Sequence, residues 1–214
     1  MNVTVIGGTG FVGSQIVSEL AARGHKVQTI VRNPEKVRDT DISVVKADVL
    51  HDDITAYLKN ADAVISAYNA GWTNPELYRD FVEGSRKIEK ETQASGAKRL
   101  IVIGGAGSLY DAEGKQLVDA ADFPESIKPG AAAARDYYNE LKQNTVLDWT
   151  YFSPAIEMHP GTSGTRTGTY RTGADHPVFD AAGRSVLSVE DVAVAIADEV
   201  EQHRFPKQRF TAAY

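Results

Sequence analysis

The feature that most constrains this chain is a glycine-rich turn between an apolar strand and a helix. The N-terminus is "MNVTVIGGTGFVGSQIVSELAARG", in which the β-branched run 2–6 predicts a strand and 11–24 predicts a helix. The turn between them contains Gly7, Gly10 and Gly13, which permit tight geometry and let a ligand approach the backbone. A helix N-terminus directly after such a turn favours anions. The placement predicts the pyrophosphate loop of a dinucleotide-binding fold; the alternative is a glycine-rich turn without a ligand.

Strands and helices alternate along most of the chain. Regular alternation implies βαβ crossovers and a parallel sheet that is covered on both faces. We therefore expect an α/β, Rossmann-type doubly wound core over 1–155 and a small C-terminal substrate lobe over 156–214, packed on the same domain. Strands are expected at 2–6, 26–31, 42–47, 62–67, 99–105, 148–155 and 209–214. Helices are expected at 11–24, at 52–61, from the Asn74 N-cap and Pro75 to Gly96, at 130–144, and from a capping box at 188–191 to about Gln202.

Composition excludes several classes of function. The chain has 214 residues, a formal net charge of −6 and no cysteine. An acidic chain is a poor polyanion binder, so no nucleic-acid partner is expected. The absence of cysteine removes thiol catalysis, disulfides and zinc–thiolate sites, and it fits a cytoplasmic location. The five histidines are dispersed, so no metal site is expected, and no apolar run approaches a membrane span.

The end of the second strand bears on the choice of nucleotide. An NAD site usually carries an acidic residue there for the ribose 2′-hydroxyl, but this segment reads "TIVRNPEK". Arg32 occupies the strand end, and no acidic residue lies between Glu19 and Glu35. A guanidinium suits a 2′-phosphate, and Lys36 could add positive charge. The segment therefore favours NADP over NAD; the alternative is a solvated surface arginine.

Several segments together resemble a known superfamily. They are "VIGGTGFVGSQIV", "VRNP", "KADV", "IVIGGAGSLY", "LDWTYFSPA", "RTGTYRTGAD" and "VLSVEDVAVAIADEVE". The chain is similar to atypical short-chain dehydrogenases/reductases, and within them to the NmrA-like NAD(P)H-binding proteins often assigned as NADH-flavin reductases. The similarity covers nearly the whole chain, although the glycine motif itself is shared across the superfamily.

The resemblance implies a set of cofactor contacts at strand ends. The pyrophosphate would lie on the glycine loop, the 2′-phosphate on Arg32, adenine beside the third strand, the riboses beside the fourth and fifth, and the nicotinamide carboxamide beside the sixth. In chain order the implied residues are Gly7, Thr9, Gly10, Phe11, Val12, Arg32, Asp48, Val49, Ala67, Tyr68, Gly104, Gly105, Ser153, Pro154 and Ala155.

The sequence also contains Tyr138 and Lys142 in the spacing of a dehydrogenase proton relay. Family members that use the pair carry it about four turns before the next strand, whereas Lys142 lies about two turns before Trp149. Two turns displace a side chain by about 11 Å along the helix axis, and the family register falls near Pro129 and Ala133. A general acid must come within about 3 Å of the reacting atom. We therefore expect two structural helix residues and assign no catalytic residue.

Hydride transfer to a planar ring does not need that relay, because the cofactor supplies the chemistry. We expect an NADPH-dependent reductase, with NADPH preferred over NADH, that acts on flavin or a similar planar small molecule such as a quinone. The expected substrate pocket is Ser108, Tyr110 and Phe152, with Tyr68 as a further aromatic candidate; all four could instead be ordinary core or loop residues. Two alternatives stay open: a non-catalytic NADP-sensing regulator, and a triad-type dehydrogenase or epimerase using the Tyr–Lys pair. The chain is expected to be a monomer or homodimer.

Overall fold

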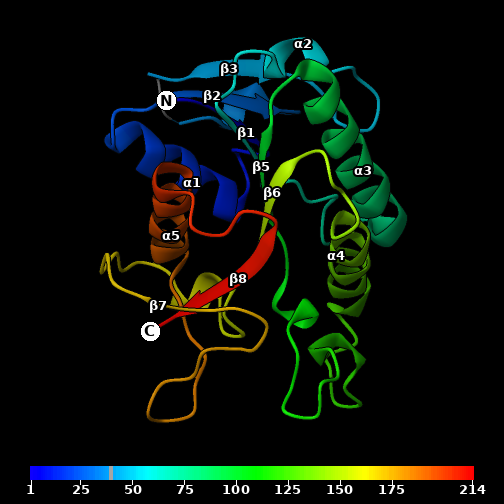
Figure 1. Cartoon of the computed structure of the whole chain (residues 1–214), viewed down its shortest axis with the longest axis vertical. Helices are drawn as coiled ribbons and strands as arrows, with labels where there is room; N and C mark the ends of the chain where they lie inside the picture. Colours follow the sequence, from blue (N-terminus) through cyan, green and yellow to red (C-terminus); the bar gives the residue numbers. More distant parts are fainter. Residues whose placement is uncertain (39–40) are drawn as a thin grey trace.

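The centre of the molecule is one twisted sheet with helices on both faces (Figure 1). The computed structural model describes residues 1–38 and 41–214. The strand order is β3-β2-β1-β4-β5-β6-β8-β7, and every neighbouring pair is parallel except β7 with β8. The strands are β1 (Asn2–Ile6), β2 (Lys26–Val31), β3 (Ser43–Lys46), β4 (Ala63–Ser66), β5 (Arg99–Ile103), β6 (Asp148–Ser153), β7 (Arg171–Gly173) and β8 (Gln208–Ala213). The predicted Rossmann-like α/β fold is confirmed.

Two helical layers cover the sheet. Figure 1 shows α1 and α5 on one face and α3 and α4 on the other. The helices are α1 (Phe11–Ala22), α2 (Thr55–Leu58), α3 (Leu77–Ser95), α4 (Lys128–Leu141) and α5 (Val189–Gln202), with 3-10 turns at Pro34–Lys36, Ala106–Ser108, Leu117–Asp119 and Pro160–Thr162. Each layer encloses its own apolar cluster, because β-strand side chains alternate between the two faces.

Two of the helix ends predicted at glycines are confirmed, whereas the predicted start of one helix is not. Gly24 and Gly96 have φ of 80° and 86°, the left-handed conformation that ends α1 and α3. α3, however, begins at Leu77, with Glu76 in the N-cap position. Asn74 instead holds the preceding turn, where its Oδ1 accepts a hydrogen bond from the Glu76 N–H at 2.9 Å. The predicted Asn74 cap was therefore wrong, because the same side chain satisfies a turn before the helix.

The C-terminal segment belongs largely to the core. β8 lies in the sheet between β6 and β7, and α5 packs against α1. Ser188 caps α5 by accepting the Asp191 N–H at 3.1 Å, but the Asp191 carboxylate binds Thr167, Gly168 and Tyr214, so the second half of the capping box is absent. Of the segment 156–214, expected as a small lobe packed on the same domain, α5 and β8 thus lie in the core, because the last strand pairs with β6 inside the sheet.

Candidate functional site

The candidate site lies at the edge of the sheet where the parallel strands end. The strand order reverses between β1 and β4, so the loops after these two strands diverge there. Ligands of open α/β sheets bind in the crevice at such a point. β5 and β6 end two residues earlier than expected, which leaves Gly104, Gly105, Pro154 and Ala155 in the loops at this edge.

The glycine turn is fixed by close backbone contacts. Gly7 has φ of 87°, and a Cβ there would lie 2.6 Å from the Ala67 carbonyl oxygen. A Cβ at Gly13 would lie 2.2 Å from the Gly7 carbonyl oxygen. Both glycines are therefore required for β1, β4 and α1 to approach one another, independently of any ligand.

Gly10 has a different environment. It is exposed, its backbone is extended, and a Cβ there would meet only the Gly7 carbonyl oxygen, at 3.3 Å. It is the N-cap of α1 and supplies no side-chain hydrogen bond to the first turn. The first N–H groups of α1 are thus left without a capping side chain, beside Thr9, Phe11 and Val12. This open cradle at a helix N-terminus fits a pyrophosphate.

The end of β2 presents an exposed arginine. Arg32 is exposed and has no hydrogen bond or ion pair with any residue in 1–38 or 41–214. It lies near Tyr68: burial raises the pKa of Tyr68 to about 12, Asp80 and Asp48 add to the rise, and the positive charge of Arg32 opposes it. Arg32, Asp48 and Tyr68 therefore gather at one end of the edge, although they come from the ends of three strands. An exposed guanidinium that has no partner in the described part of the chain fits the 2′-phosphate of NADP.

Other predicted residues at this end are less accessible. Val49 is 5% exposed and belongs to the apolar cluster under α3 and α4. The Asp48 Oδ1 accepts the Leu50 N–H at 3.0 Å, which holds the loop after β3 in place. The Tyr68 hydroxyl donates to the Asp80 carbonyl at 3.0 Å. The Asp48 and Tyr68 side chains hold these loops in place. Because Val49 is almost fully buried, little of its surface is available for the predicted contact with adenine.

The loops after β5 and β6 are joined by two buried serines. The hydroxyls of Ser108 and Ser153 lie 2.8 Å apart, and Ser108 also donates to the Gly105 carbonyl at 2.9 Å. Position 104 requires glycine, because a Cβ there would lie 2.1 Å from the Tyr151 hydroxyl. Pro154 and Ala155 are buried behind Ser153. The structure thus brings together the residues predicted beside the nicotinamide, with Ser108 serving as a buried tie between loops.

The structure corrects the prediction that Phe152 lines the substrate pocket. Phe152 is fully buried and packs against Phe210, with ring centroids 4.9 Å apart, in the cluster under α1 and α5. Its neighbours Tyr151 and Ser153 point to the opposite face, since side chains alternate along a strand. Phe152 is therefore a core residue and does not line an acceptor pocket. Tyr110, by contrast, is partly exposed.

Arg209 is a residue that the sequence analysis missed. Its side chain is fully buried and pairs with Asp175, and it donates to the Ser108 carbonyl. The guanidinium carbon lies 5.0 Å from the centroid of the Tyr110 ring and 4.6 Å from that of Tyr138. It therefore ties β8 to the loop after β5. The only signal in the sequence was a basic residue inside an otherwise apolar strand, where a buried charge needs a partner.

Tyr138 and Lys142 do not form a relay in this structure. The Lys142 ammonium lies over the face of the Tyr138 ring, 4.9 Å from its centroid, and burial raises the pKa of Tyr138 despite the opposing charge of Arg209. A relay requires the reverse shift. The residues of α4 that face the end of β5 are alanines: the Ala134 Cβ lies 3.7 Å from where a Cβ of Gly105 would stand.

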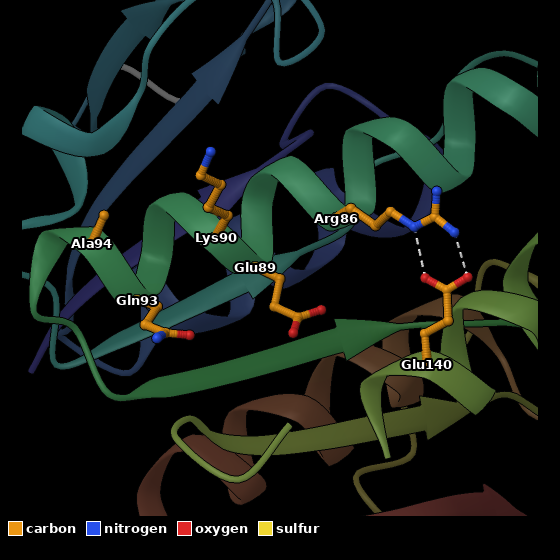
Figure 2. A pocket seen from close by; sticks show the side chains of 6 residues that line it. All are labelled: Arg86, Glu89, Lys90, Gln93, Ala94 and Glu140. Carbon is orange, nitrogen blue, oxygen red and sulfur yellow. Dashed lines mark hydrogen bonds and ion pairs between the residues drawn. The ribbon is translucent and has the colours of Figure 1, made fainter. Parts of the chain in front are cut away.

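A surface groove between α3 and α4 lies away from this edge (Figure 2). Its lining side chains come from the C-terminal halves of the two helices, and Arg86 pairs with Glu140 across it at 2.6 Å. Helix C-termini lie at the opposite edge of a parallel sheet from the strand ends. The groove is therefore unrelated to the cofactor crevice. Among the described residues, no group of histidine and acidic side chains could hold a metal ion, and no helix is long and apolar enough to cross a membrane.

The fold and this edge define a Rossmann-type dinucleotide-binding protein. The chain matches the NAD(P)H-binding family over residues 7–203 and belongs to that family. It is 36% identical over 214 residues to YwnB of Bacillus subtilis, an uncharacterized protein, with 99% of this chain and 97% of that protein aligned. The predicted kinship with short-chain dehydrogenase/reductase-like NAD(P)-binding proteins is confirmed.

Two solved structures share the whole fold but carry different provisional assignments. A Bacteroides thetaiotaomicron protein, provisionally an epimerase, has a TM-score of 0.90 and 40% identity, covering 100% of this chain and 96% of that one. A Streptococcus pneumoniae protein, provisionally an NADH-flavin reductase, has a TM-score of 0.89 and 32% identity, covering 100% and 99%. The neighbours are therefore reductase-like or epimerase-like NAD(P)-binding proteins.

Proposed function

We propose that this protein is an NADPH-dependent reductase of flavin or a similar planar acceptor. The observation that carries the proposal is the pair of alanines on α4 that face the end of β5. The Ala134 Cβ is 3.7 Å from the Cβ position of Gly105, and the Ala131 Cβ is 3.2 Å from that of Gly107. Methyl groups at these two positions offer no proton donor beside the loop after β5. Ketone and sugar chemistry would need such a donor, whereas hydride transfer to a planar ring does not.

The residues of this chain would act by binding the cofactor and by orienting it. The Gly10 cradle would hold the pyrophosphate, and Arg32 the 2′-phosphate. The buried Ser108–Ser153 pair would fix the loops beneath the nicotinamide, and Pro154 with Ala155 would close the site toward the core. When bound, NADPH supplies the hydride, and the acceptor takes its proton from solvent. Preference for NADPH over NADH rests on Arg32, which has no partner among the described residues.

A steady-state screen tests the proposal. The purified protein is mixed with NADPH or NADH and with flavin mononucleotide, a quinone or an azo dye, and oxidation of the nicotinamide is followed. We expect turnover with at least one planar acceptor and faster turnover with NADPH at limiting concentration. Tight NADPH binding without turnover would instead support an NADP-sensing regulator. Conversion of a nucleotide sugar in the presence of NAD⁺ would support an epimerase.

A further inference from the structure

The chain has two tryptophans in opposite environments. Trp149 is 4% exposed, and its indole N–H donates to the Asn144 carbonyl at 3.1 Å. Trp72, in the connection between β4 and α3, is 62% exposed, the largest exposed fraction among the aromatic residues that stand out at the surface. Most of the indole is therefore accessible to a ligand, and an exposed aromatic ring can stack on a planar one.

The turn that carries Trp72 is well ordered by hydrogen bonds. The Asn74 N–H donates to the Gly71 carbonyl at 3.0 Å, and the Asn74 side-chain amide donates to the Ala70 carbonyl at 3.4 Å and to Asp80 at 2.8 Å. Gly71 has φ of 102°, which few other residues adopt. The indole is therefore presented on a turn of defined geometry, and little conformational entropy would be lost on binding.

Trp72 lies against the first turn of α4. A Cβ at Gly130 would lie 2.8 Å from the indole ring and 3.2 Å from Leu77, so the glycine makes room for the ring. The next residue, Ala131, faces Gly107 in the loop after β5. The indole thus stands over the same first turn of α4 that packs against the loop after β5, where the acceptor is proposed to bind. One edge of the ring rests on α4 and most of the remaining surface faces solvent.

We propose that Trp72 is the specificity-determining residue of the acceptor site and stacks on the planar ring of the acceptor. This inference rests on the proposed reductase function and narrows its substrate class to polycyclic planar rings such as the isoalloxazine of a flavin. An indole gains most by stacking on an extended heteroaromatic ring, and the gain grows with the overlapping area. The proposed pyrophosphate and 2′-phosphate contacts lie on the glycine loop and on Arg32, outside this turn, so we expect the effect of Trp72 to fall on the acceptor.

Steady-state kinetics give the first test. We expect Trp72→Ala to raise KM for flavin mononucleotide about tenfold or more, and to change KM for single-ring benzoquinone less, while the NADPH dissociation constant stays within about twofold. Trp72→Phe should restore most of the lost affinity. Tyr57→Ala is the matched control, since Tyr57 is 47% exposed on α2 and belongs to none of the proposed cofactor or acceptor contacts; it should leave both constants unchanged. An unchanged KM in Trp72→Ala, with active parent protein, would overturn the inference and leave the proposed function intact. A parallel loss of NADPH affinity would overturn it as well.

A binding measurement separates this inference from the proposed function. Flavin mononucleotide is titrated into the NADP⁺-bound protein, and tryptophan emission is followed in the parent and in Trp72→Phe, which keeps only the buried Trp149. We expect saturable quenching of the component that Trp72→Phe lacks. If the parent reduces no acceptor, the proposed function fails, and this titration still decides the inference: quenching of the Trp72 component supports stacking, and its absence overturns it.

Discussion

Replacing Tyr138 with phenylalanine distinguishes a planar-acceptor reductase from a triad-type dehydrogenase. The change removes one hydroxyl, which forms no hydrogen bond with any residue the structure describes, and keeps the ring. The ring packs 4.7 Å from Tyr151 and under the Arg209 guanidinium, so the fold should be little affected. We expect a change in unfolding free energy within about 0.5 kcal/mol.

The expected effect on turnover follows from position. Ala134 faces the end of β5, and Tyr138 lies four residues further along α4, about 6 Å along the helix axis. The Tyr138 ring packs against Tyr151 and the Arg209 guanidinium, and the Lys142 ammonium lies over the ring face, so the side chain is held as a packing residue and not as a proton donor within the roughly 3 Å that general acid catalysis requires. We therefore expect kcat to stay within about threefold of the parent. Loss of a working general acid would instead cost about 10²–10⁴-fold, or roughly 3–5 kcal/mol of transition-state stabilisation.

The assay is NADPH oxidation with the best acceptor of the screen, with NADPH affinity measured separately by fluorescence titration. Tyr137→Phe is the matched control, because the Tyr137 hydroxyl donates to Glu89 at 3.1 Å and is buried in the same helix. Tyr137→Phe should lower the unfolding free energy by about 1 kcal/mol and leave kcat unchanged. A hundredfold loss of kcat in Tyr138→Phe alone, with cofactor affinity and fold intact, would refute the placement and make the Tyr138–Lys142 pair catalytic.

Three further predictions concern cofactor binding and acid stability. Gly10→Val should abolish NADPH binding, measured by titration. The melting temperature should change little, because the backbone at Gly10 is extended and a Cβ there meets only one oxygen, at 3.3 Å. Retained binding would show that the phosphates lie elsewhere. Arg32→Ala should weaken NADPH binding by about 1.5–3 kcal/mol and leave NADH affinity nearly unchanged, and equal affinities of the parent for the two nucleotides would contradict the assignment. Hydrogen bonds from Arg166, opposed by burial and reinforced by Arg23, lower the pKa of Glu19 below its ordinary value of 4.5. Its contribution to stability is therefore complete above that value and is lost as the pH falls through the lower pKa of the folded state. Glu19→Gln should cost about 1–2 kcal/mol in urea unfolding at neutral pH, and that difference should shrink near pH 3; a difference independent of pH would exclude the ion pairs as its cause.

Local patterns were sufficient for most of the strands and helices. The alternation of β-branched runs with amphipathic stretches predicted a parallel sheet with helices on both faces, because each βαβ unit is specified by periodicity within a short segment. Gly24 and Gly96 were recognisable as helix stops, since the left-handed conformation is a property of single residues. The gathering of strand-end residues such as Arg32 and Tyr68 also followed, because parallel strands end at one edge.

What the sequence could not give depends on contacts between distant segments. The insertion of β8 between β6 and β7 is decided by pairing across more than fifty residues, and it moved the C-terminal part into the core. That pairing buries Arg209 against Tyr138 and Asp175, and it sets Phe152 against Phe210 on the opposite face. In the sequence alone, Tyr68, Tyr110 and Phe152 were equivalent aromatic candidates for the acceptor pocket. Only the tertiary structure decided that Phe152 fills the core while Tyr110 stays partly exposed, because a strand residue's direction depends on its place in the pleat and on which helix layer packs above it.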